Sequence, residues 1–130
     1  MILVDTHIVV WLAFAPQKIS KKAKQAIADA RKNADGLAIS DITLLELATL
    51  VNKGRIRLEI SVESFLQEVE SRFVVLTMNG RVCARAIAIP ATYPKDPADR
   101  IIGATALVEG LSLLTADREI RRSGVVQTIW

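Results

Sequence analysis

Three aspartates in the last third of the chain have the type and spacing to form an acidic site. Asp96 and Asp99 lie three residues apart at the predicted start of a helix, and Asp117 closely follows the apolar run 111–114. Carboxylates at a helix start and beyond the next strand can meet at one edge of an α/β sheet, where such folds form their sites. Clustered carboxylates bind hard divalent cations. The alternative is that these residues only cap their helices.

Two further acids occupy comparable places earlier in the chain. Asp5 directly follows the apolar run 2–4, and Glu46 lies inside the predicted helix 41–52. For Asp5, the simpler explanation is a cap on the following helix. For Glu46, it is a polar stripe on an amphipathic helix, formed by Thr43, Glu46, Thr49 and Lys53. Helical geometry alone leaves open whether Glu46 instead projects over the sheet edge toward Asp5.

The only histidine and the only cysteine are not assigned to this chemistry. His7 lies at a helix start, where a lone histidine is usually exposed, so it is left outside the predicted site. Cys83 is far from His7 in the sequence and is predicted to be a small core residue rather than a nucleophile. A single cysteine also excludes an internal disulfide and is typical of a reducing compartment.

Short apolar runs alternate with helical patterns along the whole chain, and these elements must position the acids. Strands are predicted at 2–4, 37–39, 73–77, 111–114 and 125–129. Helices are predicted at 8–15, 20–34, 41–52, 61–71, 81–89 and 97–109, with a short one after Asp117. The body of helix 97–109 is apolar nearly all round, and Gly103, Ala104 and Ala106 are expected to allow close approach to the sheet. This alternation indicates an α/β fold with a mostly parallel sheet covered on both faces.

Length and composition favour one domain over residues 1–130. Apolar residues make up 51% of the 130 residues, enough for a substantial core. No apolar run approaches the roughly 18 residues that span a bilayer, since the longest, 8–15, ends at Pro16. The chain start lacks a basic segment and Asp5 interrupts its first apolar run, so no signal peptide is expected. The sequence therefore predicts a cytoplasmic location.

The charge balance is mildly basic and does not by itself require nucleic acid as a partner. The formal net charge is +3, with a pI near 9.3. The distribution is uneven, with basic clusters at Lys18, Lys21, Lys22 and Lys24, at Lys53, Arg55 and Arg57, and at Arg121 and Arg122. For any one cluster, the simpler explanation is a solvated surface.

The acidic segments resemble the motifs of the PIN-domain family, and most closely those of VapC-type toxins from toxin–antitoxin pairs. The matching segments are Val4-Asp5-Thr6, Leu45-Glu46-Leu47, Lys95-Asp96-Pro97-Ala98-Asp99-Arg100 and Leu114-Thr115-Ala116-Asp117. The resemblance implies a three-layer α/β/α fold and an endoribonuclease that uses Mg²⁺ or Mn²⁺. It implies that the catalytic and metal-binding acids are Asp5, Glu46, Asp99 and Asp117, with Asp96 and Thr115 as auxiliary residues.

The physics of clustered carboxylates agrees with that assignment. Two such charges in close contact repel by about 1 kcal/mol in water and several-fold more at a protein surface. Either some of the carboxyls protonate or a divalent cation neutralises them. We expect Asp5 with Asp99 or Asp117 to hold one ion, and Glu46 to orient the attacking water or share a second ion. The sequence leaves open whether one or two ions bind.

The resemblance also implies an RNA substrate, a homodimer and an inhibitory antitoxin protein. Lys53, Arg55 and Arg57 are the predicted RNA-binding residues, and Trp11 and Phe14 on the apolar helix 8–15 are the predicted antitoxin contacts. Apolar residues on helices 41–52 and 81–89 are the predicted dimer surface. The competing hypothesis is a catalytically silent interaction module whose acids only cap helices. A phosphatase-like protein fits poorly, because Asp5-Thr6-His7 lacks a second acid two residues on.

Overall fold

A computed structural model describes residues 1–33 and 35–130, and its element order matches the predicted alternation of strands and helices. The strands are β1 (Ile2–Val4), β2 (Leu37–Ser40), β3 (Val74–Leu76), β4 (Leu113–Leu114) and β5 (Thr128–Ile129). The helices are α1 (Thr6–Phe14), α2 (Lys21–Lys32), α3 (Asp41–Asn52), α4 (Val62–Arg72), α5 (Gly80–Ala88), α6 (Pro97–Glu109) and α7 (Arg118–Ser123). A 3₁₀ turn, Pro16–Lys18, follows α1.

The five strands form one parallel sheet in the order β3-β2-β1-β4-β5. Leu3 pairs with Ala38 of β2 on one side and with Leu113 of β4 on the other, so β1 is the central strand. The chain builds outward from β1 to β3 and then returns to place β4 on the opposite side of β1. The crevice beyond the carboxyl ends of β1 and β4 is therefore the switch point where open α/β sheets bind ligands.

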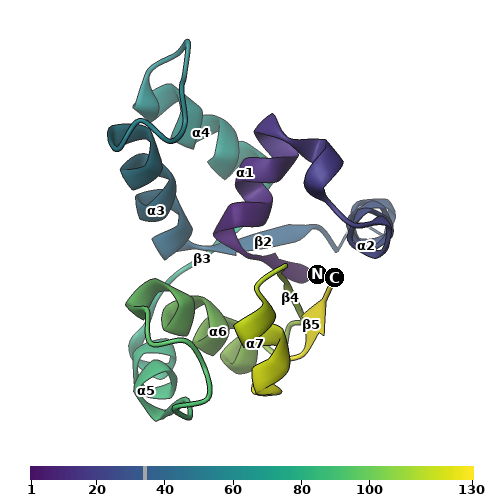
Figure 1. Ribbon diagram of the computed structural model, residues 1–130, viewed down its shortest axis with the longest axis vertical. Coiled ribbons are helices and arrows are strands. Elements are labelled where there is room, and N and C mark those ends of the chain that lie inside the picture. The colour runs from purple at the N-terminus through teal and green to yellow at the C-terminus, as the bar shows by residue number, and fades with distance from the viewer. Residues whose placement is uncertain (34) are drawn as a thin grey trace.

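Helices cover both faces of the sheet, as the three layers in Figure 1 show. Consecutive strand residues point to opposite faces, so Leu3 and Val4 enter different cores. Val4 packs in a core with α1, α2, α3 and α4, whereas Leu3 packs with residues of α5, α6 and α7. The predicted α/β/α class is confirmed.

Helix starts and stops follow the predicted capping signals. The side chains of Ser20, Ser40 and Ser61 accept hydrogen bonds from backbone N–H groups in the first turns of α2, α3 and α4. Helix α6 has Pro97 at its first position and ends at Gly110 in a left-handed conformation, as expected. These caps fix where each helix begins relative to the strand end before it.

Some sequence expectations differ from the structure. The last two strands are shorter than predicted, and α1 begins two residues earlier because Asp5 caps it at Thr6. The expected end of the second helix, at Ala34, lies outside the described residues. Cys83 is exposed rather than in the core, so that prediction was wrong.

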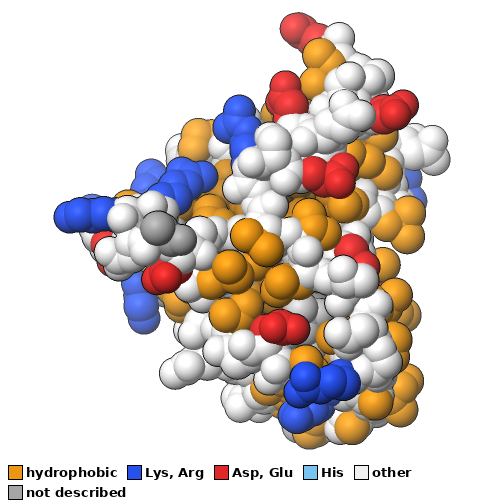
Figure 2. Space-filling view, turned by 180° about the vertical axis from the view of Figure 1, so that it is seen from behind, with side chains coloured by type: hydrophobic (Ala, Val, Ile, Leu, Met, Phe, Trp, Pro, Cys, Tyr) orange, Lys and Arg blue, Asp and Glu red, His pale blue; other side chains and the backbone are white. Residues whose placement is uncertain are grey.

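Basic side chains are concentrated on α2, away from the carboxyl edge of the sheet. Lys and Arg side chains gather over α2 at the left of Figure 2, and in Figure 1 α2 lies at the end of the sheet opposite to the start of α3. Among the described residues, none of the helices combines the length and apolar character needed to cross a bilayer.

Candidate active site

Asp5 is the most firmly held acid at the carboxyl edge of the sheet. Its side chain is 4% exposed. Its Oδ1 accepts a hydrogen bond from the Thr6 backbone N–H at 2.9 Å, and its Oδ2 accepts one from Thr115 Oγ1 at 2.7 Å. The second bond joins the end of β1 to the end of β4 across the switch point. Asp5 therefore caps α1 and also presents a fixed carboxylate to the crevice.

Glu46 reaches this edge from the middle of α3. Thr6 Oγ1 donates a hydrogen bond to Glu46 Oε1 at 2.5 Å and lies 3.0 Å from Thr43 Oγ1. Because the Thr6 hydroxyl donates to Glu46, the Thr43 hydroxyl donates to Thr6. Thr43 is fully buried, which contradicts the alternative of a solvent-facing polar stripe through Thr43 and Glu46. This chain of hydroxyls aims Glu46 toward Asp5.

Asp96 and Asp99 are set by the start of α6. Asp96 Oδ2 accepts a hydrogen bond from the Asp99 N–H at 3.1 Å, which is the predicted cap. Arg100, next to Asp99, donates to the backbone carbonyls of Ala86, Ile89 and Pro94. Two of those carbonyls lie at the end of α5, so Arg100 fastens the first turn of α6 to its neighbouring helix. Asp99 thereby faces the crevice from a rigid helix start.

Asp117 joins the same edge through the turn after β4. Its Oδ1 accepts a hydrogen bond from the Ile120 N–H and caps α7, while its own N–H donates to Thr115 Oγ1 at 3.1 Å. His7 braces this turn from α1, because its Nε2 accepts a hydrogen bond from the Ala116 N–H at 3.0 Å. That bond places the ring proton on Nδ1, 3.6 Å from Asp5 Oδ2. Two hydrogen bonds thus tie segment 5–7 to segment 115–117, and the bond from Asp117 N–H to Thr115 orders the second segment internally.

The electrostatics show that these acids lie within range of one another. Burial, followed by the charges of Asp5, Asp96, Glu46 and Asp117, raises the pKa of Asp99 to about 7. Burial also raises the pKa of Glu46, with the Thr6 hydrogen bond opposing it and the charges of Asp5 and Asp96 adding to it. Asp5, Glu46 and Asp99 line one cavity of about 240 Å³ with Thr6, His7, Val10, Trp11 and Leu50.

This geometry allows a comparison with known proteins. The family model described as "PIN domain" matches residues 2–125. The chain belongs to the PIN-domain family. It is 40% identical to "Ribonuclease VapC22" of Mycobacterium tuberculosis (strain ATCC 25618 / H37Rv), over 99% of this chain and 98% of that protein.

Solved structures share the same PIN-domain architecture. The chain is similar to one in a toxin–antitoxin complex from Klebsiella pneumoniae, with 26% identity, a TM-score of 0.63, and coverage of 92% of this chain and 89% of that one. It is also similar to a chain of VapBC2 from Rickettsia felis bound to a promoter DNA fragment, with 21% identity and a TM-score of 0.73. That alignment covers 98% of this chain and 97% of the other, and it bears on the fold alone.

Several residues that organise the PIN site were missed from the sequence. Thr6 and His7 directly follow Asp5, and Thr43 lies one helical turn before Glu46, so their positions were the available signals. His7 is half-buried and hydrogen-bonded rather than free in solvent, which corrects the expectation for it. Tyr93 is the least obvious. It is 1% exposed, and burial, followed by the charges of Asp5, Asp99 and Asp117, raises the pKa of its hydroxyl.

The predicted partner residues divide between separate cavities of the PIN domain. Lys53 and Arg55 line a cavity next to Glu46, but Arg57 lines a different groove with Phe14. Trp11 faces the acidic cavity, where it packs edge-on against His7 at 5.1 Å and tilted against Trp130 at 5.8 Å. The basic cluster and the aromatic pair therefore each contribute to two different surfaces.

Proposed function

We propose that this PIN domain is a Mg²⁺- or Mn²⁺-dependent endoribonuclease and the toxin of a toxin–antitoxin pair. The observation that carries the proposal is that Asp5, Glu46 and Asp99 line one cavity, where burial and the charges of the neighbouring acids raise the pKa of Asp99 to about 7. The relative at 40% identity is named a ribonuclease, which supports RNA as the substrate. The proposed catalytic acids are Asp5, Glu46, Asp99 and Asp117. Because the proposed substrate is cellular RNA, the proposal includes a cytoplasmic location.

The donor set fits a hard divalent cation. Carboxylate and hydroxyl oxygens from Asp5, Glu46, Asp99, Asp117 and Thr115 are the ligands that Mg²⁺ and Mn²⁺ prefer. A cation would also relieve the repulsion that raises the Asp99 pKa. In the described parts of the chain, no three His, Cys, Asp or Glu side chains are already close enough to hold an ion. We therefore expect metal binding to draw the carboxylates together.

A bound ion would polarise the phosphodiester and lower the pKa of a ligated water. The residues of the chain supply the remaining parts of the reaction. Glu46, with its raised pKa and its fixed Thr6 hydrogen bond, accepts the proton of the attacking water. Asp5 is fixed by two hydrogen bonds and keeps the reacting centre between β1 and β4. The water oxygen bonds to phosphorus as the phosphorus–oxygen bond of the leaving strand breaks, and the leaving oxygen takes a proton from solvent.

Helix capping explains part of the acidic cluster but not all of it. Asp5, Asp96 and Asp117 each accept a backbone N–H at a helix start, which favours the silent-module alternative. Glu46 and Asp99 cap no helix, since Glu46 lies in the middle of α3 and Asp99 is itself the residue capped. Two partly buried carboxyls held beside other acids raise the energy of the fold without a helix-capping benefit. A binding role for the cluster explains them.

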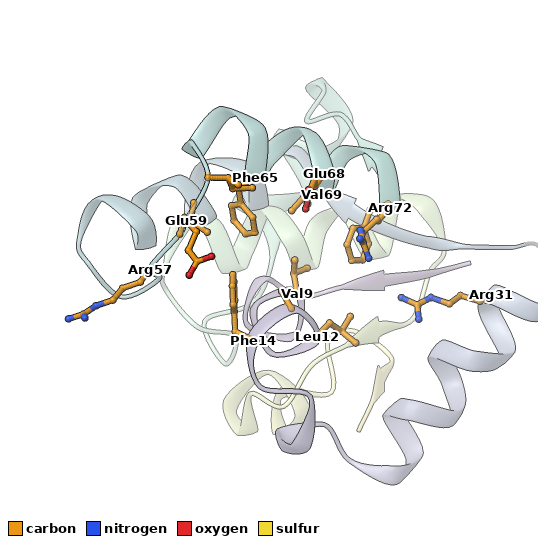
Figure 3. Close-up of a pocket in the computed structure, with 14 residues that line it drawn as sticks. Val9, Leu12, Phe14, Arg31, Arg57, Glu59, Phe65, Glu68, Val69 and Arg72 are labelled. Atoms are coloured by element: carbon orange, nitrogen blue, oxygen red, sulfur yellow. The ribbon is translucent and has the colours of Figure 1, made fainter.

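The proposed antitoxin would occupy a groove on the other face of α1. This groove, about 700 Å³ in volume, has an apolar floor and a charged rim of Arg31, Arg57, Glu59, Glu68 and Arg72. Figure 3 shows Phe14 of α1 and Phe65 of α4 pointing toward one another across it, with ring centroids 5.9 Å apart. An amphipathic helix with charged edges fits such a surface. Phe14 then contacts the antitoxin directly, whereas Trp11 lies in the acidic cavity.

Homodimer formation is a further part of the proposal. Of the apolar residues predicted for the dimer surface, Leu47, Val82, Ala86 and Ile89 are buried in the core of the monomer. Leu45 on α3 and Ile87 on α5 remain 63% and 87% exposed. An apolar side chain as exposed as Ile87 favours an interface with a second copy. Light scattering at tens of micromolar protein should give the mass of a dimer, and a monomer would contradict this.

Removing one carboxylate tests the proposed activity. Asp99→Asn keeps the shape of the side chain, and no hydrogen bond to the Asp99 carboxyl occurs among the described residues, so the fold should persist. We expect Asp99→Asn, and separately Asp5→Asn, to lower Mg²⁺-dependent RNA cleavage about a hundredfold or more. Glu109→Gln at the far end of α6 is the matched control and should cleave as wild type does. Wild-type cleavage by Asp99→Asn at saturating Mg²⁺ would disprove the site.

A further inference from the structure

A second cavity adjoins the acidic one and shares a wall with it. It measures about 410 Å³ and lies between α3, the loop after α3 and the first turn of α6. Glu46 and Leu50 line both cavities, so Lys53 and Arg55 lie in the cavity next to the acidic one. Its other walls are mostly apolar, formed by Ile42, Leu45, Pro97, Ala98 and Ile101. This combination of an apolar wall and two cations lies directly beside the proposed reaction site.

The two cations are held in place by the way α3 ends. Glu46 and Lys53 are seven residues apart, so they lie on the same face of α3 about 10 Å from one another. Gly54 then adopts φ of 73°, a left-handed conformation that lets the chain reverse. The N–H groups of Arg55 and Ile56 return to the Leu50 carbonyl, and Ile56 is 6% exposed in the core. The backbone that carries Lys53 and Arg55 is therefore anchored.

Neither cation is paired with an acid in the part of the chain that the structure describes. Across residues 1–33 and 35–130, Lys53 and Arg55 form no ion pair, although Glu46 and Asp96 line the same cavity. A structural role alone would place them at the end of α3, where cations favour the helix dipole. That role does not require an apolar cavity beside them that shares Glu46 with the acidic cavity.

We propose that this cavity is the subsite for the RNA segment next to the scissile phosphodiester. A base packs against the apolar wall of Leu45 and Ile101, and Lys53 and Arg55 bind the flanking phosphates. Exposed apolar side chains beside unpaired cations match a nucleotide, which combines a flat apolar face with an anionic backbone. The inference rests on the proposed ribonuclease function and assigns Lys53 and Arg55, but not Arg57, to substrate binding. The acids Glu46 and Asp96 mark the end of the cavity nearest the reacting phosphate.

The test compares two double variants that remove the same charge from different surfaces. Lys53→Gln/Arg55→Gln changes the cavity, whereas Lys21→Gln/Lys22→Gln changes α2 at the opposite end of the sheet. The probe is a short single-stranded oligoribonucleotide that the wild-type protein cuts. We expect the cavity variant to raise KM about tenfold with kcat within about twofold, because binding is lost equally from ground state and transition state. The α2 variant should match wild type.

Binding measured with cleavage disabled gives a second readout. On an Asp99→Asn background, the slope of log affinity against log salt should become shallower by about 1.4, since each phosphate contact contributes about 0.7 on single strands. An abasic nucleotide next to the cleaved bond should weaken binding of the oligoribonucleotide about fivefold. Leu45→Ala should weaken binding of the abasic oligoribonucleotide little further, because both changes remove the contact between the base and Leu45. Arg57→Gln should leave the salt slope unchanged.

The outcomes separate this inference from the function on which it rests. If wild type neither cuts nor binds RNA, the ribonuclease function and the subsite are both wrong. If wild type cuts RNA but Lys53→Gln/Arg55→Gln has the wild-type KM, only the subsite is wrong. The same conclusion follows if the α2 variant raises KM as much as the cavity variant does. If Leu45→Ala converts a dimer to a monomer in light scattering without weakening binding, a second copy of the chain covers this wall instead of RNA.

Discussion

Helix α1 separates two cavities that differ in size and in chemistry. On one side, Thr6, His7 and Trp11 face the acidic cavity of about 240 Å³. On the other side, Val9, Leu12 and Phe14 line the groove of about 700 Å³. The acidic cavity is organised by hydrogen bonds to side chains, whereas the groove is formed by apolar contacts between α1 and α4.

This difference explains why α1 is apolar nearly all round although it lies beside the solvent. Ile8 and Val9 are buried in the core, so the helix serves a core and two cavities at once. The smaller cavity suits an ion and a phosphate, and the larger one suits a protein segment. Because α1 forms a wall of both cavities, a partner bound in the groove would be separated from the acids by α1.

Phe14→Ala should give the largest difference between the two cavities. The Phe14 side chain is 49% exposed and packs against Phe65 in the groove. If it anchors the antitoxin, its loss should weaken that complex by about 2 kcal/mol, or roughly thirtyfold. RNA cleavage by the free protein should stay at the wild-type level, because Phe14 contacts none of the acids. Titration calorimetry with the antitoxin and a cleavage assay measure the two effects.

Two further variants serve as controls for this comparison. Ile87→Ala also removes an exposed apolar side chain, but from α5 on the other layer, and should not weaken the antitoxin complex. Trp11→Ala should show the reverse of Phe14→Ala and lower cleavage more than antitoxin binding, since Trp11 packs against His7 beside Asp5. Equal effects of Trp11→Ala and Phe14→Ala on both assays would mean that the two cavities act as one surface.

The fold was predicted well from the sequence because the capping residues and apolar runs indicate the same helices and strands that the α/β fold requires. Ser20, Ser40 and Ser61 cap the predicted helices, and the apolar strands pair as a parallel sheet. The two cavities were less predictable, because periodicity does not say which face of an apolar helix lines a cavity. Trp11 and Phe14 are three residues apart, yet they lie in different cavities.

The acids of the proposed site and the auxiliary Thr115 were predicted, but the hydroxyls of Thr6 and Thr43 were not. Threonine is common in any sequence, and the importance of these two residues comes from contacts between distant segments. Arg100 was part of a recognised motif, but its hydrogen bonds to the end of α5 required the packing of two helices. Gly103 was expected to bring α6 close to the sheet. In the structure, the Tyr93 side chain occupies the place that a Cβ at position 103 would need.

Gly103→Ala should therefore disturb the packing around Tyr93, near the acids, and spare the groove. A Cβ at position 103 would lie 2.7 Å from Tyr93 Cζ and closer still to the hydroxyl, so the buried ring must move. We expect a loss of about 1–3 kcal/mol in the free energy of unfolding, from denaturant titration. Because charges of Asp5, Asp99 and Asp117 reach the Tyr93 hydroxyl, cleavage should fall as well, while antitoxin binding should persist.

A double variant tests whether the Tyr93 contact is the cause. Tyr93→Leu removes the ring atoms that would collide with the new Cβ at position 103, so Tyr93→Leu/Gly103→Ala should be more stable than the sum of the two single changes predicts. Additive losses in stability would mean that the strain at position 103 arises elsewhere. Tyr93→Phe is less useful, because Cζ remains in the way.

The smallest expected effect is a pH dependence of stability that belongs to the acidic cavity alone. The pKa of Asp99 is about 7 in the folded protein, against 3.8 for an ordinary aspartate. Between these values, the folded state holds a proton that the unfolded chain has released, so stability should fall as the pH rises from about 4 to about 7 and then level off. Glu46 adds a change of the same sign. After allowance for solvent screening, about 1 kcal/mol, or a few degrees in Tm, is expected.

Asp99→Asn should flatten this decline, because it removes the titrating group and one of the repelling charges. At pH 8 without metal, the variant should melt a few degrees above wild type, while Glu109→Gln should follow the wild-type curve. Added Mg²⁺ should raise the Tm of wild type more than that of Asp99→Asn, since the cation neutralises the charges that the substitution already reduces. A wild-type Tm that rises steadily from pH 4 to 8 in the presence of a chelator would mean that Asp99 is ionised at low cost. The carboxylates would then be too far apart to act as one site.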